Sequence, residues 1–286
     1  MPRRTAPSKN LPNPTRERQS KQVRNRLLGL VIAVGAAAAA FSIASIPAAG
    51  ATSLLSFVGV GQAPALPRAP NGKPNLSGVW QVMSTASWDI QDHSAEKGVP
   101  SGQGVVEGND VPYQPAAAAR KKENFANRAT ADPLTKCYLP GVPRIMYMPF
   151  PFQILQTPTH VEIFFEYTHA VRQIYVNGSP HPAGQIDWWM GDSRGRWEGD
   201  TLVVDLVDFN DETWFDRAGN FHSDALHLVE RYTLADPDHI NYEVTVEDPK
   251  VFTRPWKMNM IFYRHKEKNF QLLEYECNTF EEGTSR

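Results

Sequence analysis

The second half of the chain alternates apolar and polar residues with a period of two, which restricts the possible folds more than any other sequence feature. In the segment 239–248, every second residue from Ile240 to Val246 is apolar, and the residues between them are polar. Because strand side chains point alternately to two faces, this pattern predicts half-buried antiparallel strands. The pattern recurs in four further segments: residues 160–168, 201–209, 257–265 and 270–277.

Turn-forming residues separate these segments, as at Asn177-Gly178 and Asp236-Pro237-Asp238. With a further segment at residues 75–83, we expect about nine strands between Ser77 and Cys277. Regular short strands favour a barrel or a sandwich, and closure of a barrel removes exposed edges. The sequence therefore predicts an all-β fold, an antiparallel barrel of about nine strands that follows a long N-terminal loop region. One helix is expected within that region, at residues 115–129.

The first 51 residues have the composition of a signal peptide. A basic stretch precedes the uncharged segment 27–51, which ends in Ala49-Gly50-Ala51, a small-x-small cleavage pattern. The alternative is an uncleaved anchor, since these residues are numerous enough to span a bilayer. We expect a periplasmic or secreted protein with the following organisation: a signal peptide or anchor at 1–51, a flexible linker at 52–75, the barrel domain at 76–280 and a tail at 281–286.

The charge of the expected mature chain argues against nucleic-acid binding. Residues 1–51 carry eight basic residues and one acidic residue, a net charge of +7, and the whole chain carries −2, so residues 52–286 carry −9. Phosphate contacts need clustered cations, so we expect no nucleic-acid partner. Membrane anchoring through residues 27–51 is expected only if the segment is not cleaved.

The chain contains two cysteines, Cys137 and Cys277. Both lie in the part expected to be exported, and an even number of cysteines in an oxidising compartment favours one disulfide. Two buried free thiols are the alternative.

Several short stretches resemble known families. Gly78-Val79-Trp80 resembles the G-x-W of the first barrel strand of lipocalins and other calycins. This resemblance implies a lipocalin-like barrel with a binding cavity. Other stretches resemble an abundant group of exported bacterial proteins, which implies no particular activity: DPLTKC, RWEGDTLVV, GNFHSDALHLVERYT, DPKVFTRPW and LLEYECN.

The segment 209–227 concentrates reactive side chains between two apolar strands. If the chain is extended after Gly219-Asn220, His222 and Asp224 share one face, where a histidine and a carboxylate can act as a base and its orienting partner. Asp211 is a further carboxylate nearby. A polar loop that only caps backbone groups is the alternative. His227 would point away from His222, which weakens a metal site built from both.

Two carboxylates follow apolar residues in register and are expected to point inward. They are Asp208, after Leu206, and Glu230, after Leu228. A buried carboxylate needs a partner or a raised pKa, so each is a candidate acid or base. The alternatives are solvent exposure of Asp208 at the strand end and an ion pair of Glu230 with an interior arginine. The candidate arginines are Arg172, Arg194 and Arg254.

Aromatic residues that gather near these segments favour a small-molecule pocket, although core packing also explains them. The predicted ligand-binding residues are Trp214, Phe215, Trp189, Trp256, Arg194 and Asp208.

The sequence therefore favours a binding protein for a small, largely apolar molecule. The alternative is a hydrolase, lyase or isomerase that uses His222 with Asp224, Asp211 or Glu230. A structural protein of the cell envelope is a third possibility. No metal or cofactor is expected, because the chain contains no P-loop, no dinucleotide-binding glycine pattern and no H-E-x-x-H.

Overall fold

A computed structural model describes residues 65–96, 99–184 and 186–278. The expected signal peptide and much of the expected linker lie outside these residues. Within the described part, no helix has the length and apolar character needed to cross a membrane. The elements are β1 (Gly78–Val82), η1 (Glu107–Asn109), α2 (Pro115–Ala131), η2 (Pro133–Lys136), η3 (Arg144–Tyr147), β2 (Phe152–Gln156), β3 (His160–Phe165), β4 (Val171–Tyr175), β5 (Asp192–Glu198), β6 (Thr201–Val207), β7 (His227–Asp236), β8 (His239–Glu247) and β9 (Trp256–Arg264).

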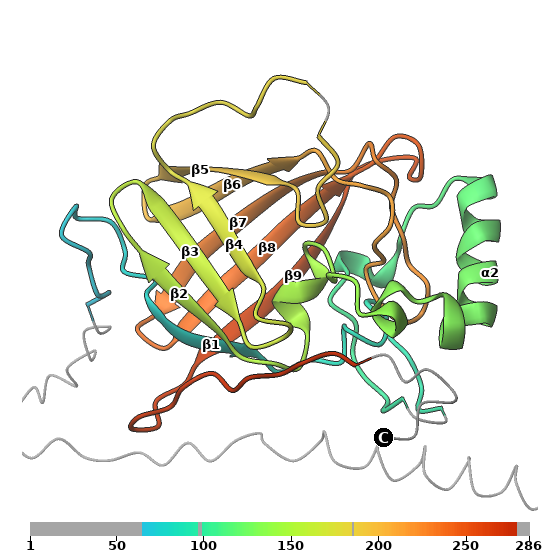
Figure 1. Cartoon of the computed structure of the whole chain (residues 1–286), viewed down its shortest axis with the longest axis horizontal. Coiled ribbons are helices and arrows are strands. Elements are labelled where there is room, and N and C mark those ends of the chain that lie inside the picture. The colour runs from blue at the N-terminus through green and yellow to red at the C-terminus, as the bar shows by residue number, and fades with distance from the viewer. Residues whose placement is uncertain (1–64, 97–98, 185, 279–286) are drawn as a thin grey trace, which may run out of the picture. The chain divides into compact units, whose positions relative to one another are not determined.

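The strands form a closed barrel in chain order, in which β9 pairs with β1 (Figure 1). Alternation is visible in the burial of β8, where Ile240, Tyr242, Val244 and Val246 are buried. Closure leaves no open edge between the first and last strands. The predicted all-β barrel of about nine strands is confirmed, and its shape is compatible with a calycin-like fold.

One pair of strands departs from the antiparallel arrangement. β4 and β5 are parallel, and their ladder pairs only Ile174 with Ser193 and Tyr175 with Arg194. β5 and β6, in contrast, pair along their whole length. A parallel pair needs a crossover connection, to which the described residues 176–184 and 186–191 belong; they form the yellow arch in Figure 1. We call the junction between β4 and β5 the seam.

Aromatic rings fill the interior of the barrel. Tyr242 stacks on Phe262 with ring centroids 4.7 Å apart, and Tyr232 lies 5.0 Å from Tyr242. Phe262 also meets Phe152 edge to face at 5.1 Å. These rings come from β2, β7, β8 and β9, so they also link β2 and β9, which do not pair with each other. Aromatic pairs at such distances stabilise the core beyond the area that they bury.

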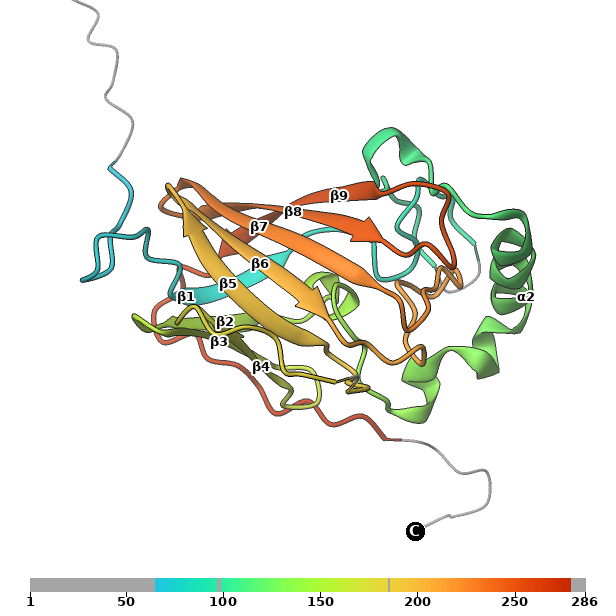
Figure 2. The ribbon, with the colours of Figure 1, turned by 90° about the horizontal axis from the view of Figure 1, so that it is seen from above.

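The segment 209–227 closes one end of the barrel, the same end where α2 lies in Figure 2. Phe209, Phe215 and Phe221 are only 1–2% exposed, so the aromatic residues of this segment turn inward. Gly219 adopts a φ of 82°, and a Cβ there would lie 2.7 Å from the Cβ of Asn124 in α2. Glycine thus permits the close approach of the segment to the helix. The predicted helix is confirmed and extends to Ala131.

The predicted disulfide is also confirmed, since Cys137 and Cys277 are bonded with a Cα–Cα distance of 5.5 Å. The prediction of a strand at residues 270–277 is wrong. This segment runs along the outside of the barrel (Figure 1) and makes one isolated bridge, between Tyr275 and Tyr167. It has no strand to extend, because β9 already pairs with β1.

Replacement of both cysteines by alanine should lower the free energy of unfolding by about 2–5 kcal/mol, because the bond closes a long loop in the unfolded chain. Urea unfolding monitored by circular dichroism would measure this effect. Unchanged stability of the double variant would show that the cross-link does not restrict the unfolded chain.

Candidate functional site

A cleft of about 310 Å³ lies over the seam, where the strand ladder is shortest. The apolar side chains of the cleft come from the loop that precedes η3, from β4 and from the crossover connection. The polar side chains come from β4 and β5. Its lining includes Trp188, Trp189, Met190, Arg172, Asp192 and Ser193. Leu139, Val171 and Tyr175 complete the apolar surface. The cleft is therefore an aromatic depression whose polar groups belong to the barrel strands.

A buried ion pair lies beneath this cleft. The Arg172 nitrogens Nη1 and Nη2 donate to the two carboxylate oxygens of Glu230 at 3.0 and 2.6 Å, and both side chains are at most 2% exposed. Burial disfavours the charged guanidinium, but the charge and hydrogen bonds of Glu230, together with Tyr232 and Tyr242, outweigh burial and hold the pKa of Arg172 above its ordinary value. Arg172 also donates to Ser193 Oγ from Nε and Nη2 at 3.1 Å, so it joins β4, β5 and β7.

The hydroxyl groups of two tyrosines complete the interior polar cluster. The Tyr242 hydroxyl donates to Glu230 Oε1 at 2.6 Å, and Arg172 donates to the Tyr232 hydroxyl at 3.3 Å. Burial, together with the charge of Glu230, raises the pKa of both phenols well above the ordinary value. Both tyrosines therefore stay protonated and act as hydrogen-bonding groups, not as bases.

Gly191–Gly195 reads G-D-S-R-G and matches the G-x-S-x-G pattern of a hydrolase nucleophile elbow. The structure places it at the start of β5, whereas an elbow is a sharp turn between a strand and a helix. Ser193 is 2% exposed and accepts hydrogen bonds from Arg172. The motif therefore does not form a nucleophilic site.

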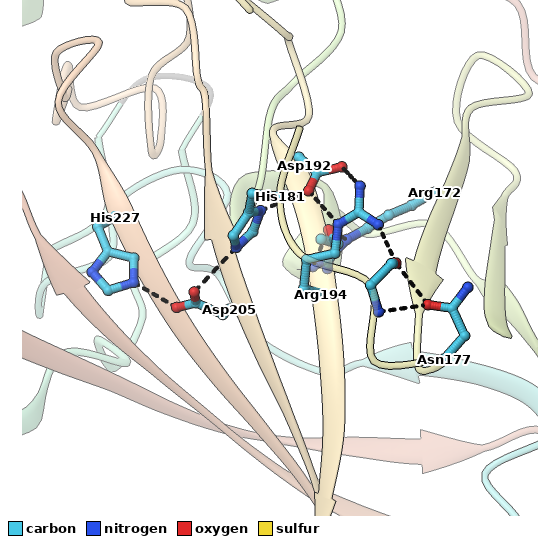
Figure 3. A network of polar contacts seen from close by, with 9 residues as sticks. Arg172, Asn177, His181, Asp192, Arg194, Asp205 and His227 are labelled. Carbon is cyan, nitrogen blue, oxygen red and sulfur yellow. Dashed lines mark hydrogen bonds and ion pairs between the residues drawn. The ribbon is translucent and has the colours of Figure 1, made fainter. Parts of the chain in front are cut away.

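A chain of polar contacts extends from the cleft across the outer face of β5, β6 and β7 (Figure 3). Arg194 donates to both oxygens of Asp192 at 2.6 and 2.8 Å, and His181 Nδ1 lies 2.6 Å from Asp192 Oδ2. His181 Nε2 lies 3.1 Å from Asp205, and His227 Nε2 lies 2.6 Å from the other oxygen of Asp205. We call these five residues the outer network.

Asp205 is the centre of the outer network. Burial alone would raise its pKa, but hydrogen bonds from His227 and His181 outweigh this effect and hold the pKa of Asp205 below its ordinary value. The carboxylate is therefore charged and bridges two histidines. No group of three or more His, Cys, Asp or Glu side chains has metal-binding geometry in the described part of the chain.

His222 is buried, and both of its ring nitrogens contact neutral groups. Its Nε2 lies 2.6 Å from Thr213 Oγ1, and its Nδ1 lies 2.9 Å from the Ser223 carbonyl oxygen. Burial lowers the pKa of His222, so the neutral ring donates to the carbonyl and accepts from the threonine. This is the arrangement of an activated hydroxyl, yet His222 and Thr213 are only 1% and 2% exposed, so a substrate cannot reach them.

The other predicted catalytic residues do not gather around His222. The expectation that His222 and Asp224 share a strand face is wrong, because β7 begins only at His227. Asp224 lies in a turn and pairs with Lys250 at 2.6 Å. Asp211 is exposed, and Glu230 lies in the barrel interior. Glu230 was correctly expected to point inward, and Arg172 is the arginine that pairs with it.

The predicted ligand-binding residues divide into three groups. Trp189 lines the cleft over the seam, and Arg194 belongs to the outer network beside it. Trp214, Phe215 and Trp256 are at most 8% exposed and pack at the closed end of the barrel, where Trp256 meets Phe215 edge to face at 5.7 Å. Asp208 follows β6 with a φ of 62°, so strand alternation ends before this residue.

Sequence reasoning missed His181, Asp192, Asp205 and His227. Asp205 and His227 could have been noticed as outward-facing polar residues of neighbouring strands. His181 lies in the connection 176–191, which has no periodicity, so no local signal places it beside these residues.

Comparison of the sequence with models of known protein families gives no match, and comparison with curated proteins also gives none.

Substitution Glu230→Gln should lower the free energy of unfolding by about 3–5 kcal/mol, because it leaves the buried charge of Arg172 without its partner. The double variant Arg172→Met/Glu230→Gln should be less destabilised than Glu230→Gln, since it removes that charge and keeps an acceptor for Tyr242. Glu162→Gln, on the outer face of β3, is the matched control and should change stability by less than about 0.5 kcal/mol. If urea unfolding showed that the double variant is destabilised at least as much as Glu230→Gln, the ion pair would not be the stabilising unit.

Proposed function

We propose that the protein binds a small, largely apolar molecule in the cleft over the seam. The observation that supports this most strongly is the combination of an aromatic surface with a few fixed polar groups, which is typical of small-molecule sites. Trp188, Trp189 and Met190 supply the apolar surface, and the two charged side chains that line it, Arg172 and Asp192, are almost wholly buried. A volume of about 310 Å³ fits a compact ligand.

The charged groups of the cleft favour an uncharged ligand. Each nitrogen of the Arg172 guanidinium donates to a protein group, and both oxygens of Asp192 accept from Arg194. An ionic ligand would have to compete with these bonds, whereas an apolar ligand needs only the aromatic surface. Removal of apolar area from water then provides most of the binding free energy.

A larger cleft of about 590 Å³ lies between α2 and the segment before η1. It contains Trp88 and Phe125, but charged side chains intersperse them, among them Asp89, Arg128 and Arg217. Arg128 covers the Phe125 ring at 4.0 Å and Arg217 covers Trp88 at 4.7 Å. These cations occupy ring faces that a ligand would need, so the smaller cleft is the better candidate.

An enzyme that uses His222 is less well supported, because His222 is buried and its predicted carboxylate partners lie elsewhere. We further propose that the protein acts after export, as a periplasmic or secreted binder. The disulfide and the basic, then apolar, N-terminal sequence support this location.

Titration of the purified protein with the neutral naphthalene dye prodan tests this function. Dye emission and tryptophan fluorescence should both change on binding. Trp189→Ala should weaken binding by on the order of 1–3 kcal/mol, because the variant loses buried aromatic area in the cleft.

Trp88→Ala is the matched control, since Trp88 is also a half-buried tryptophan but lines the larger cleft. The affinity of Trp88→Ala for prodan should equal that of the wild type. Weakened binding in Trp88→Ala together with unchanged binding in Trp189→Ala would move the site to the surface around Trp88 and contradict the proposal.

A further inference from the structure

Both ring nitrogens of His181 face carboxylate oxygens, those of Asp192 and Asp205. A neutral imidazole donates from one nitrogen and presents a lone pair at the other, which would meet a carboxylate oxygen. His227 is in the same situation, with Asp205 at Nε2 and Glu247 at Nδ1, 3.3 Å away. The imidazolium form alone satisfies both contacts of each ring.

The charges around the two rings also favour the imidazolium form of both histidines. The groups that face them are Asp192 and Arg194 on β5, Asp205 on β6 and Glu247 on β8. With both rings neutral, these groups carry three negative charges and one positive charge. With both rings protonated, the cluster is electrically balanced. Asp192 is only 6% exposed, so water screens its charge poorly.

The outer network is connected to the cleft over the seam. Asp192 belongs to both, because it lines the cleft and its carboxylate contacts the His181 ring. The contact between His181 and Asp192 joins two points of the chain that flank Trp188, Trp189 and Met190. The contact therefore restrains the segment that carries the aromatic surface of the cleft.

We propose that protonation of His181 and His227 strengthens ligand binding at this cleft, so that affinity falls when the two rings lose their protons. This inference rests on the proposed function, since it concerns the affinity of the same site. Protonation stabilises the arrangement of residues 188–190 that binds the ligand. Loss of a proton turns one hydrogen bond of each ring into a contact between two acceptors, and the fraction of binding-competent molecules falls.

Two measurements on the full chain at pH 5.5 and 8.5 test the proposal. The affinity for prodan, which is neutral at both pH values, should be roughly tenfold higher at the lower pH, as expected for the loss of one charge-assisted hydrogen bond. Amide exchange of residues 186–192, corrected for the intrinsic effect of pH, should show greater protection at the lower pH.

His181→Gln should bind prodan at both pH values with the weaker affinity that the wild type has at pH 8.5. Its amide protection at residues 186–192 should be the same at both pH values. His239→Gln is the matched control, because His239 pairs with Asp236 away from the outer network, and it should keep the wild-type pH dependence. The proposal is wrong if wild-type affinity and protection are the same at both pH values, or if His181→Gln keeps the wild-type pH dependence.

Amide exchange also separates the two proposals. If prodan does not bind but protection depends on pH through His181, the outer network responds to protons as inferred and the proposed function fails. If prodan binds with an affinity that does not depend on pH, the proposed function stands and the inference fails.

Discussion

The ion pair between Arg172 and Glu230 holds the barrel together where its backbone holds it least. β4 and β5 share a short parallel ladder, so few main-chain hydrogen bonds connect them. Arg172 extends from β4 to Ser193 on β5 and to Glu230 on β7, so one side chain connects both sides of the seam. A buried charge that loses its partner is costly, and this cost favours the one register in which the partners meet.

Strand alternation predicted the fold well, because it reports which side chains face inward. It does not report which strands are neighbours, and the parallel pair β4–β5 could not be predicted from it. Alternation at residues 270–277 also failed as a strand signal. A strand needs an edge to pair with, and closure of β9 on β1 leaves this segment none.

The same limit explains the predictions for the site. Glu230 was expected inside because alternation places it after Leu228, and the structure agrees. Arg194 follows Ser193 in β5, so it must face outward when Ser193 faces inward, and it cannot be the partner of Glu230. His222 was misplaced because the chain turns after Gly219 and becomes a strand only at His227. Long-range contacts such as that of His181 depend on the folded barrel and have no sequence signature.

The disulfide determines how the molecule carries mechanical load. Cys137 precedes β2 and Cys277 follows β9, so the covalent ring encloses every strand of the described barrel except β1. A force that pulls on residues 65 and 278 passes from Cys137 to Cys277 through the sulfur atoms. It can extend β1 and α2, while β2 to β9 bear no tension along the backbone. The strands that build the cleft are thus protected from stretching when the chain is pulled at these residues.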